Sequence, residues 1–314
     1  MSMAAVPYVV AYAGIAGFVI AVVARLVMWA RMPMHLRWEL YPVAHEGKGR
    51  AQYGGSYLED SDWWKRKREV SLWGEVKFLV PEIAFLVALK EHNPKLWLRS
   101  FPFHFGLYLV GTCTVIMMGG GVLAALAPGE ISGPLQAALC KVVPVLGGLG
   151  LGLGILGAIG LLQRRMSTPE LRLYSAPADY LNLVLFLVVF GFAFLTFSWV
   201  DRDFSAVSLF VRNLVTFKLG ELPGSGPVAV LPAVSAVLLA GLTAYIPLTH
   251  MSHFVGKYFA YHSIRWNDEP NLAGGKQEKT IQRLLSQPVT WAAPHIAGDG
   301  RRTWVDIATE EVER

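Results

Sequence analysis

The stretch from Leu135 to Leu162 reads LQAALCKVVPVLGGLGLGLGILGAIGLL and contains one charged residue, Lys141. A run this long and this apolar exceeds the roughly 18 to 20 residues that an α-helix needs to cross a bilayer. Its glycines form a small-residue surface, and such surfaces let helix backbones approach closely in lipid. The stretch therefore predicts a transmembrane helix that packs tightly at the centre of a bundle.

The glycine-rich part of this stretch also matches a dinucleotide-binding motif. Gly152 to Gly157 fits G-x-G-x-x-G, whose glycines let the backbone approach a pyrophosphate in a strand-to-helix turn. Because the match lies inside a continuous apolar span, we interpret it as helix packing and reject nucleotide binding.

Other parts of the chain share this apolar character. The stretches are Pro7–Trp29, Phe101–Ala127, Tyr180–Val200 and Val228 to about Phe254. Of the 314 residues, 54% are apolar and 16% are charged, and the mean hydropathy of +0.41 is outside the usual range of soluble domains. The first stretch is too long for a signal peptide and no cleavage site follows it, so we expect it to be retained. The sequence predicts an all-α, polytopic membrane helix bundle of about five transmembrane helices.

A sixth apolar block covers residues 76–89 and contains Lys77, Pro81 and Glu82. It is shorter than a membrane span, which favours an interfacial or re-entrant helix. The alternative is a sixth span, which would place both chain ends on the same side of the membrane.

The distribution of Lys and Arg predicts the orientation. Cations concentrate after the first, third and fifth spans, as in Lys65–Arg68, Arg164–Arg165 and Lys257 with Arg265. Because loops rich in these residues resist translocation, we expect the N-terminus outside and the C-terminus in the cytoplasm of a multi-pass inner-membrane protein. The net charge of +5 is mostly this topology signal. We expect no soluble basic domain and therefore no binding of nucleic acid.

Four segments follow from these patterns: residues 1–31 as the first transmembrane helix, 32–100 as a cytoplasmic segment, 101–260 as a four-helix membrane domain and 261–314 as a cytoplasmic tail. Each soluble segment is too short for an independent core. We expect them to dock on a cytoplasmic subunit, with a face made by Tyr41, Trp63, Trp64 and Lys65. For the end of the chain, a partly disordered tail is the alternative.

Three of the eight histidines lie in predicted spans, where an ionisable residue indicates function. His104 follows the start of the second span and His253 ends the fifth, so the two rings are expected at similar depth on antiparallel helices. Two such imidazoles provide the axial ligands of a haem iron. His104 shares its helical face with Tyr108 and Gly111, and the glycine would leave space for a porphyrin edge.

His250 leaves an alternative open. On a continuous helix it shares a face with His253, Thr249 and Ile246, so it could replace His253 as ligand or bond a haem propionate. For each histidine taken singly, a hydrogen bond to a neighbouring helix is also open. No second histidine pair remains in the spans, so one haem b is the expected maximum unless another ligand type is used. Cys113 and Cys140 lack the C-x-x-C spacing of an iron–sulfur site, so any such cluster belongs to a partner.

Three groups of residues carry a family resemblance: Ser100–Gly106, then Arg164–Arg165 with Pro169 and Arg172, and finally Pro247 with His253. From Phe101 to Tyr258 the chain resembles the gamma subunit of respiratory nitrate reductase. The resemblance implies the same five-span topology and two b haems, each held by a histidine of the second span and one of the fifth. His104 and His253 match the pair of the cytoplasm-proximal haem. Thr114 and Ser235 stand where the family has the pair of the distal haem, which implies a single haem here.

A second resemblance concerns Pro33–Pro42 and Tyr53–Tyr57. These segments are similar to cytochrome b subunits of anaerobic redox complexes such as the Tmc complex of sulfate reducers. The resemblance implies menaquinone chemistry, a cytoplasmic iron–sulfur partner related to heterodisulfide reductase and a periplasmic multihaem cytochrome c. Lys141 lies close to where the family places a quinol-binding lysine; an interfacial snorkelling lysine is the alternative.

The resulting hypothesis is the quinone-interacting cytochrome b subunit of an anaerobic respiratory oxidoreductase, which exchanges electrons between menaquinone or menaquinol and the iron–sulfur partner through one bis-histidine haem b. The alternative is a haem-free membrane anchor of a redox complex. A transporter predicts charged or broken helices near the midplane, and the spans show little of either.

Overall fold

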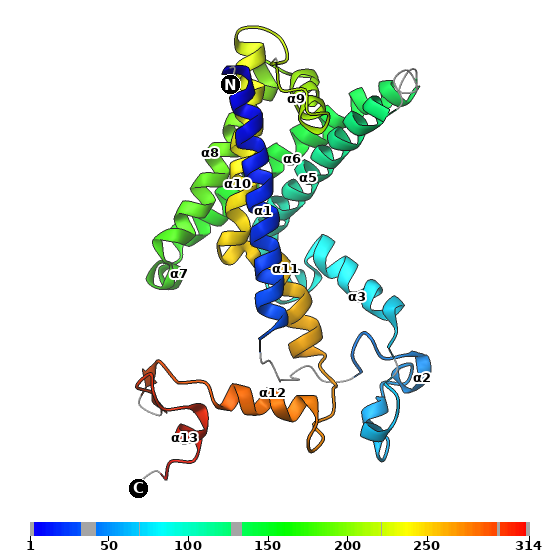
Figure 1. Cartoon of the computed structure of the whole chain (residues 1–314), viewed down its shortest axis with the longest axis vertical. Helices are drawn as coiled ribbons and strands as arrows, with labels where there is room; N and C mark the ends of the chain where they lie inside the picture. The colour runs from blue at the N-terminus through cyan, green and yellow to red at the C-terminus, as the bar shows by residue number, and fades with distance from the viewer. Residues whose placement is uncertain are drawn as a thin grey trace. The chain divides into compact units, whose positions relative to one another are not determined.

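The computed structural model describes residues 3–32, 42–68, 70–126, 134–220, 222–293 and 296–311. Within these ranges, five helices are long and apolar enough to cross a membrane (Figure 1). These spans cover Met3–Ala30, Pro94–Leu126, Leu139–Ser167, Pro177–Trp199 and Pro227–Leu248. The prediction of an all-α membrane bundle with five spanning helices is confirmed.

The long helices are α1 (Val6–Ala30), α5 (Pro94–Leu126), α6 (Pro134–Ser167), α8 (Pro177–Trp199) and α10 (Pro227–Tyr245). Four of the five begin with proline. This residue suits the first helical position because an N–H group there has no acceptor within the helix, so nothing is lost when it is missing. α5 starts at Pro94, earlier than the predicted Phe101, because a polar turn with Lys95 and Arg99 continues the same helix.

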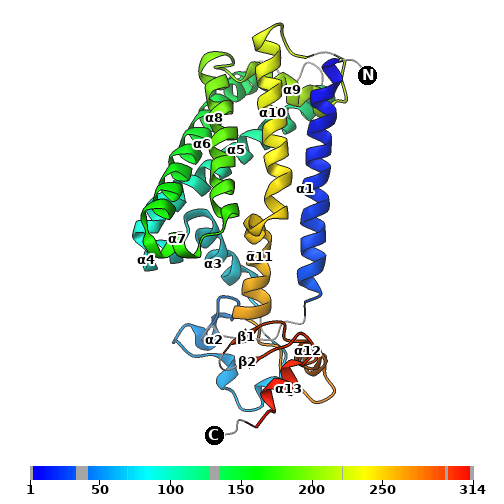
Figure 2. The same ribbon diagram turned by 90° about the vertical axis from the view of Figure 1, so that its left-hand side faces the viewer.

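Shorter elements connect them. The short α-helices are α2 (Lys48–Ala51), α3 (Leu72–Phe85), α4 (Val87–His92), α7 (Pro169–Tyr174), α9 (Ser205–Val215), α11 (His253–Phe259), α12 (Lys276–Leu285) and α13 (Trp304–Ala308). The 3-10 turns are η1 (Met3–Ala5), η2 (Tyr57–Glu59), η3 (Trp63–Lys65), η4 (Ile246–Leu248) and η5 (His250–Ser252), and η6 (Ala260–Arg265) is a π-helix. β1 (Ala292–Ala293) pairs antiparallel with β2 (Ile296–Ala297) (Figure 2).

The chain divides into two compact units. The first unit contains Met1–Ala21 and Val80–His250, and the second contains Val22–Leu79 and Met251–Arg314. The division cuts across the four consecutive segments expected from the sequence, because segments far apart in the chain fold together.

In the first unit, α5 and α6 run side by side (Figure 1), and glycines line their contact. A Cβ atom placed on Gly106 would lie 2.6 Å from the carbonyl oxygen of Gly150, and one placed on Gly150 would lie 2.9 Å from the backbone nitrogen of Val110. α6 also packs against α8, where the Phe190 ring covers Gly154. The glycine-rich stretch therefore forms a close helix-packing surface on a central helix, as predicted.

The block at residues 76–89 forms α3 and α4, which are separated by Leu86 with a φ angle of 53°. The 14 residues of α3 extend over about 21 Å, which is less than the roughly 30 Å hydrocarbon core. The structure therefore favours the non-spanning interpretation of this block.

The end of the fifth span differs from its prediction. α10 stops at Tyr245, and η4 and η5 follow before α11 begins at His253. Pro247 lies in η4 and has no N–H to continue the helical ladder, and Thr249 is extended, with a ψ angle of −178°. The prediction that His253, His250 and Thr249 share one face of a continuous helix is wrong.

In the second unit, the segments before and after the bundle share one core. Val43 packs with Tyr261 and Trp266, and the Phe78 ring lies against both aromatic rings. Neither segment has enough apolar residues for a core alone, so each completes the other.

A buried carboxylate, Asp268, links the same segments. It accepts hydrogen bonds from His45 Nε2 at 2.8 Å, from Arg68 at 2.6 Å and from the Tyr57 hydroxyl. Burial alone raises the pKa of Asp268, but the bonds from His45 and Tyr57 and the charge of Arg68 outweigh it, so the pKa lies below its usual value. Asp268 is therefore a charged anchor for the second unit.

The predicted docking face is described only in part. Trp63, Trp64 and Lys65 form η3, where Lys65 pairs with Asp62 at 3.2 Å. Tyr41 lies outside the described residues, as does most of the segment Pro33–Pro42.

Candidate functional site

His104 lies on α5 in the first unit and is held by its own helix. Its Nδ1 atom is 2.8 Å from the Ser100 carbonyl oxygen and 3.2 Å from the Ser100 hydroxyl. A carbonyl oxygen can only accept, so Nδ1 carries the proton and, in the neutral ring, Nε2 carries the lone pair. Histidines that bind metals commonly have this arrangement, because the backbone bond fixes the tautomer and the ring orientation.

Aromatic packing surrounds this position. The Phe103 ring meets the His104 ring edge-on at a centroid distance of 5.4 Å, and it also packs edge-on against Phe186 at 4.9 Å. Phe186 is fully buried on α8. The contact between Phe103 and Phe186 therefore holds the turn of α5 that carries His104 against α8.

The two residues predicted beside His104 have different surroundings. The Tyr108 hydroxyl donates a hydrogen bond to the Ile83 carbonyl oxygen at 2.8 Å. A Cβ atom added to Gly111 would meet no atom within 4 Å. Space is present beside Gly111, and its use by a porphyrin stays a prediction.

The predicted partners of His104 fall in different units. His253 begins α11 in the second unit and is exposed, so its pairing with His104 stays a prediction. His250 belongs to the first unit, and its Nε2 lies 3.6 Å from Asp179 Oδ1. Asp179 also pairs with Arg165 at 3.1 Å. The Nε2 atom of His250 therefore faces a carboxylate, and the choice between His250 and His253 as axial ligand stays a prediction.

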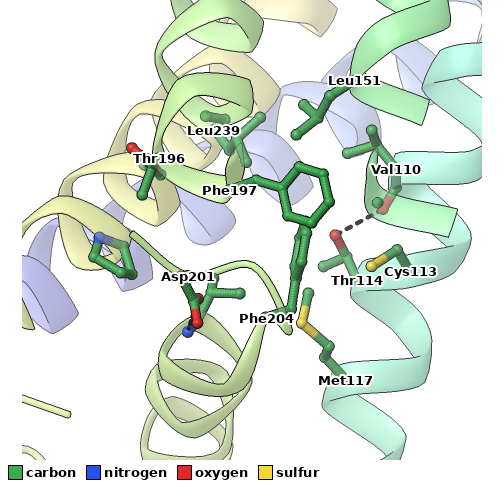
Figure 3. Close-up of a pocket in the computed structure, with 15 residues that line it drawn as sticks. Val110, Cys113, Thr114, Met117, Leu151, Thr196, Phe197, Asp201, Phe204 and Leu239 are labelled. Carbon is green, nitrogen blue, oxygen red and sulfur yellow. Dashed lines mark hydrogen bonds between the residues drawn. The ribbon is translucent and has the colours of Figure 1, made fainter. Parts of the chain in front are cut away.

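Thr114 and Ser235 line one cavity of about 50 Å³ in the first unit. Figure 3 shows Thr114 in this cavity with Thr196 and Phe197. The Thr114 hydroxyl donates to the Val110 carbonyl oxygen at 2.9 Å, and the Ser235 hydroxyl donates to Thr196 Oγ1 at 3.2 Å. The two positions at which the nitrate reductase gamma resemblance places distal ligands therefore border the same small space.

Aromatic side chains narrow the space at this level of the bundle. The Phe197 and Phe204 rings, at a centroid distance of 4.9 Å, both line the cavity (Figure 3). Pockets that take small organic ligands hold about 300 to 1,000 Å³, and a porphyrin is larger than most such ligands. The residues at this level therefore do not fit a haem, in space or in ligand type.

Lys141 lies near the start of α6 with an exposed side chain. Within the described ranges it forms no hydrogen bond or ion pair, so its proposed contact with quinol stays a prediction.

Several of these residues were not identified from the sequence. Ser100 precedes His104 by one helical turn, and this spacing is a signal that sequence reasoning can use. Asp179 faces His250 from another helix, and Phe197 and Phe204 reach the cavity from α8 and the loop after it. No local sequence pattern predicts those contacts, because each joins residues that are far apart in the chain.

These observations define a class: a multi-pass membrane helix bundle that carries an oriented imidazole inside a spanning helix. Residues 89–267 match the family model described as nitrate reductase gamma subunit, which is more than half of the chain, and the protein belongs to this family. It is also similar to the Hdr-like menaquinol oxidoreductase cytochrome b-like subunit of Archaeoglobus fulgidus. The two are 23% identical over 266 residues, which cover 80% of this chain and 76% of the relative.

Proposed function

We propose that this protein is a membrane cytochrome b subunit that exchanges electrons between menaquinone or menaquinol and an iron–sulfur partner on the cytoplasmic face. One haem b would be held by His104 and His253. The observation that carries the proposal is the His104 ring, whose Nδ1–H is fixed by the Ser100 carbonyl so that Nε2 carries the lone pair. Family membership and the name of the archaeal relative support the redox role.

A bound haem supplies one-electron transfer between a quinone and an iron–sulfur cluster. The chain contributes the ligand imidazole on α5, the helix packing that fixes it and the space beside Gly111. The small volume of the cavity beside Thr114 and Ser235 supports a single haem.

The cation distribution supports an N-terminus outside and a C-terminus in the cytoplasm. In this orientation the second unit, with Trp63 and Trp64, would dock the iron–sulfur partner. A multihaem cytochrome c would bind on the opposite face. Fusing alkaline phosphatase or a fluorescent protein to the C-terminus tests the orientation: only the fluorescent fusion should be active.

The functional test is a redox difference spectrum of the purified protein together with haem extraction. We expect about one b haem per chain, as for a single bis-histidine site. His104→Ala and His253→Ala should each lose the b-type absorbance, while Thr114→Ala should keep it.

Two outcomes would count against the proposal. A chain that folds in the membrane without haem would be a haem-free anchor subunit. Absorbance retained in either histidine variant would refute the ligand assignment while leaving the redox role intact.

A further inference from the structure

The second unit contains a cavity of about 920 Å³ that the proposed redox function does not use. The end of α1, the π-helix η6 and α12 bound it. Its basic lining residues are Arg31, Arg68, His262, Lys276, Lys279 and Arg283. Glu269 is the one carboxylate among the lining residues that the structure describes.

Three of the six basic residues that line this cavity have an acidic partner, and three have none within the described ranges. Arg68 pairs with the buried Asp268 at 2.6 Å, Lys276 lies 3.9 Å from Glu269, and His262 Nε2 lies 3.4 Å from Glu75. Arg31, Lys279 and Arg283 form no ion pair in the part of the chain that the structure describes. Three uncompensated cations around one space favour an anion with more than one negative charge.

The cations of α12 lie on one side of that helix. Lys276, Lys279 and Arg283 are spaced by three and four residues, and Thr280 on the same face also lines the cavity. Residues at this spacing are neighbours on a helix surface. The helix therefore presents its basic face to the cavity.

The cavity also borders a membrane-spanning helix. Trp29 and Ala30, the last two residues of α1, line it beside Arg31. The Trp29 ring packs edge-on against Phe259 at a centroid distance of 6.2 Å, and a Cβ atom on Gly256 would lie 3.2 Å from it. Tryptophans at helix ends mark the boundary between hydrocarbon and water. The cavity therefore opens where α1 leaves the hydrocarbon.

We propose that this cavity binds the phosphate headgroup of an anionic phospholipid. The charge suits a phosphate, the volume is in the range of ligand pockets of about 300 to 1,000 Å³, and the adjoining end of α1 places acyl chains in the bilayer. Basic pockets at this level of membrane proteins commonly hold such headgroups. The site belongs to the second unit, whereas His104 belongs to the first, and the proposal does not depend on haem.

The test uses the purified full-length protein in detergent, titrated with dioleoyl phosphatidic acid or dioleoyl phosphatidylcholine and followed by native mass spectrometry. Lys279→Gln with Arg283→Gln removes two cavity cations. Lys65→Gln with Lys67→Gln removes the same charge from the second unit outside the cavity lining. A basic residue near a lipid surface contributes about five-fold in affinity, so the cavity variant should bind phosphatidic acid about 25-fold more weakly, and the control should stay close to wild type.

Sodium pyrophosphate separates the two sources of phosphate. Bound phosphatidic acid that pyrophosphate does not displace supports a lipid headgroup. Pyrophosphate that binds with equal strength and displaces the lipid assigns the cavity to a soluble phosphate compound and overturns the lipid assignment. Equal lipid affinity in the cavity and control variants, or no preference for phosphatidic acid over phosphatidylcholine, also overturns it. An acidic partner protein would then be the better occupant. Unchanged circular dichroism in both variants confirms that they fold.

Discussion

Two levels of α5, ten residues and about 15 Å apart along the helix, use the same hydrogen-bond geometry with opposite consequences. His104 donates from Nδ1 to the carbonyl oxygen four residues earlier, and Thr114 donates from its hydroxyl to the carbonyl four residues earlier. In the imidazole this bond leaves a second nitrogen whose lone pair can bind iron, whereas the neutral threonine hydroxyl is not among the usual ligands of haem iron. The same backbone can support or abolish a ligand site, depending on the side chain.

The space beside the helix also varies along this stretch of α5. Gly111 lies between the two levels, seven residues after His104 and three before Thr114, and a Cβ atom there would meet no atom within 4 Å. At the Thr114 level, Phe197 and Phe204 leave about 50 Å³. Side chains that do not ligate iron and a small volume occur together at the Thr114 level, as the proposal of a single haem expects.

The largest effect is expected from Gly106→Leu. Its side chain would overlap the backbone of α6, where a Cβ atom would already lie 2.6 Å from the Gly150 carbonyl oxygen. Overpacking usually costs about 1 to 3 kcal/mol, and because backbone cannot yield as a side chain does, we expect the upper end of this range and loss of haem. Thermal unfolding in detergent measures the effect. Gly119→Leu on the same helix, where a Cβ meets no atom within 4 Å, is the control and should fold normally. Equal stability of the two variants would contradict the close contact of α5 and α6.

Gly111→Leu separates haem space from helix packing. Because nothing lies within 4 Å of a Cβ at this position, the fold should be retained, while haem content should fall well below that of wild type. Haem extraction normalised to protein measures this, with Gly119→Leu again as control. Full haem content in the Gly111 variant would show that the porphyrin edge lies elsewhere.

His250→Ala tests the choice between the two histidines near the end of the fifth span. Since His250 Nε2 faces Asp179 at 3.6 Å, haem content should be unchanged and only a small shift of the midpoint potential is expected from the altered charge nearby. A redox titration followed by absorbance provides both values. Loss of the b-type spectrum in this variant, with retention in His253→Ala, would reverse the ligand assignment.

The smallest effect is expected when histidine ligands are introduced at the Thr114 level without enlarging its cavity. Thr114→His combined with Ser235→His should still bind about one haem per chain, as for a single bis-histidine site, because Phe197 and Phe204 fill the level. Haem stoichiometry is the measurement. Two haems per chain in this double variant would show that the rings move aside easily. Adding Phe197→Ala tests whether that ring is the obstacle.

Local pattern was sufficient for much of the fold. Apolar length located the five spans, and the glycines of Leu135–Leu162 predicted the close packing of α6. Local pattern failed at Pro247, where the sequence stays apolar but the helix ends. Proline is apolar, so hydropathy does not reveal that its missing N–H interrupts the helical hydrogen bonds. Local pattern also gives no sign of the hydrogen bonds that join Asp268 to His45, Tyr57 and Arg68, which lie 200 or more positions away in the sequence.

The sequence by itself determined that this protein spans a membrane and that His104 lies inside a span, because both follow from the composition of single helices in a solvent that cannot hydrogen-bond. Only the tertiary structure decided that Thr114 and Ser235 border one small cavity, that His250 faces Asp179 and that distant cations surround a single space. Those facts depend on which helices meet and on which side chains fill the gap between them, and neither is encoded in the periodicity of any one segment.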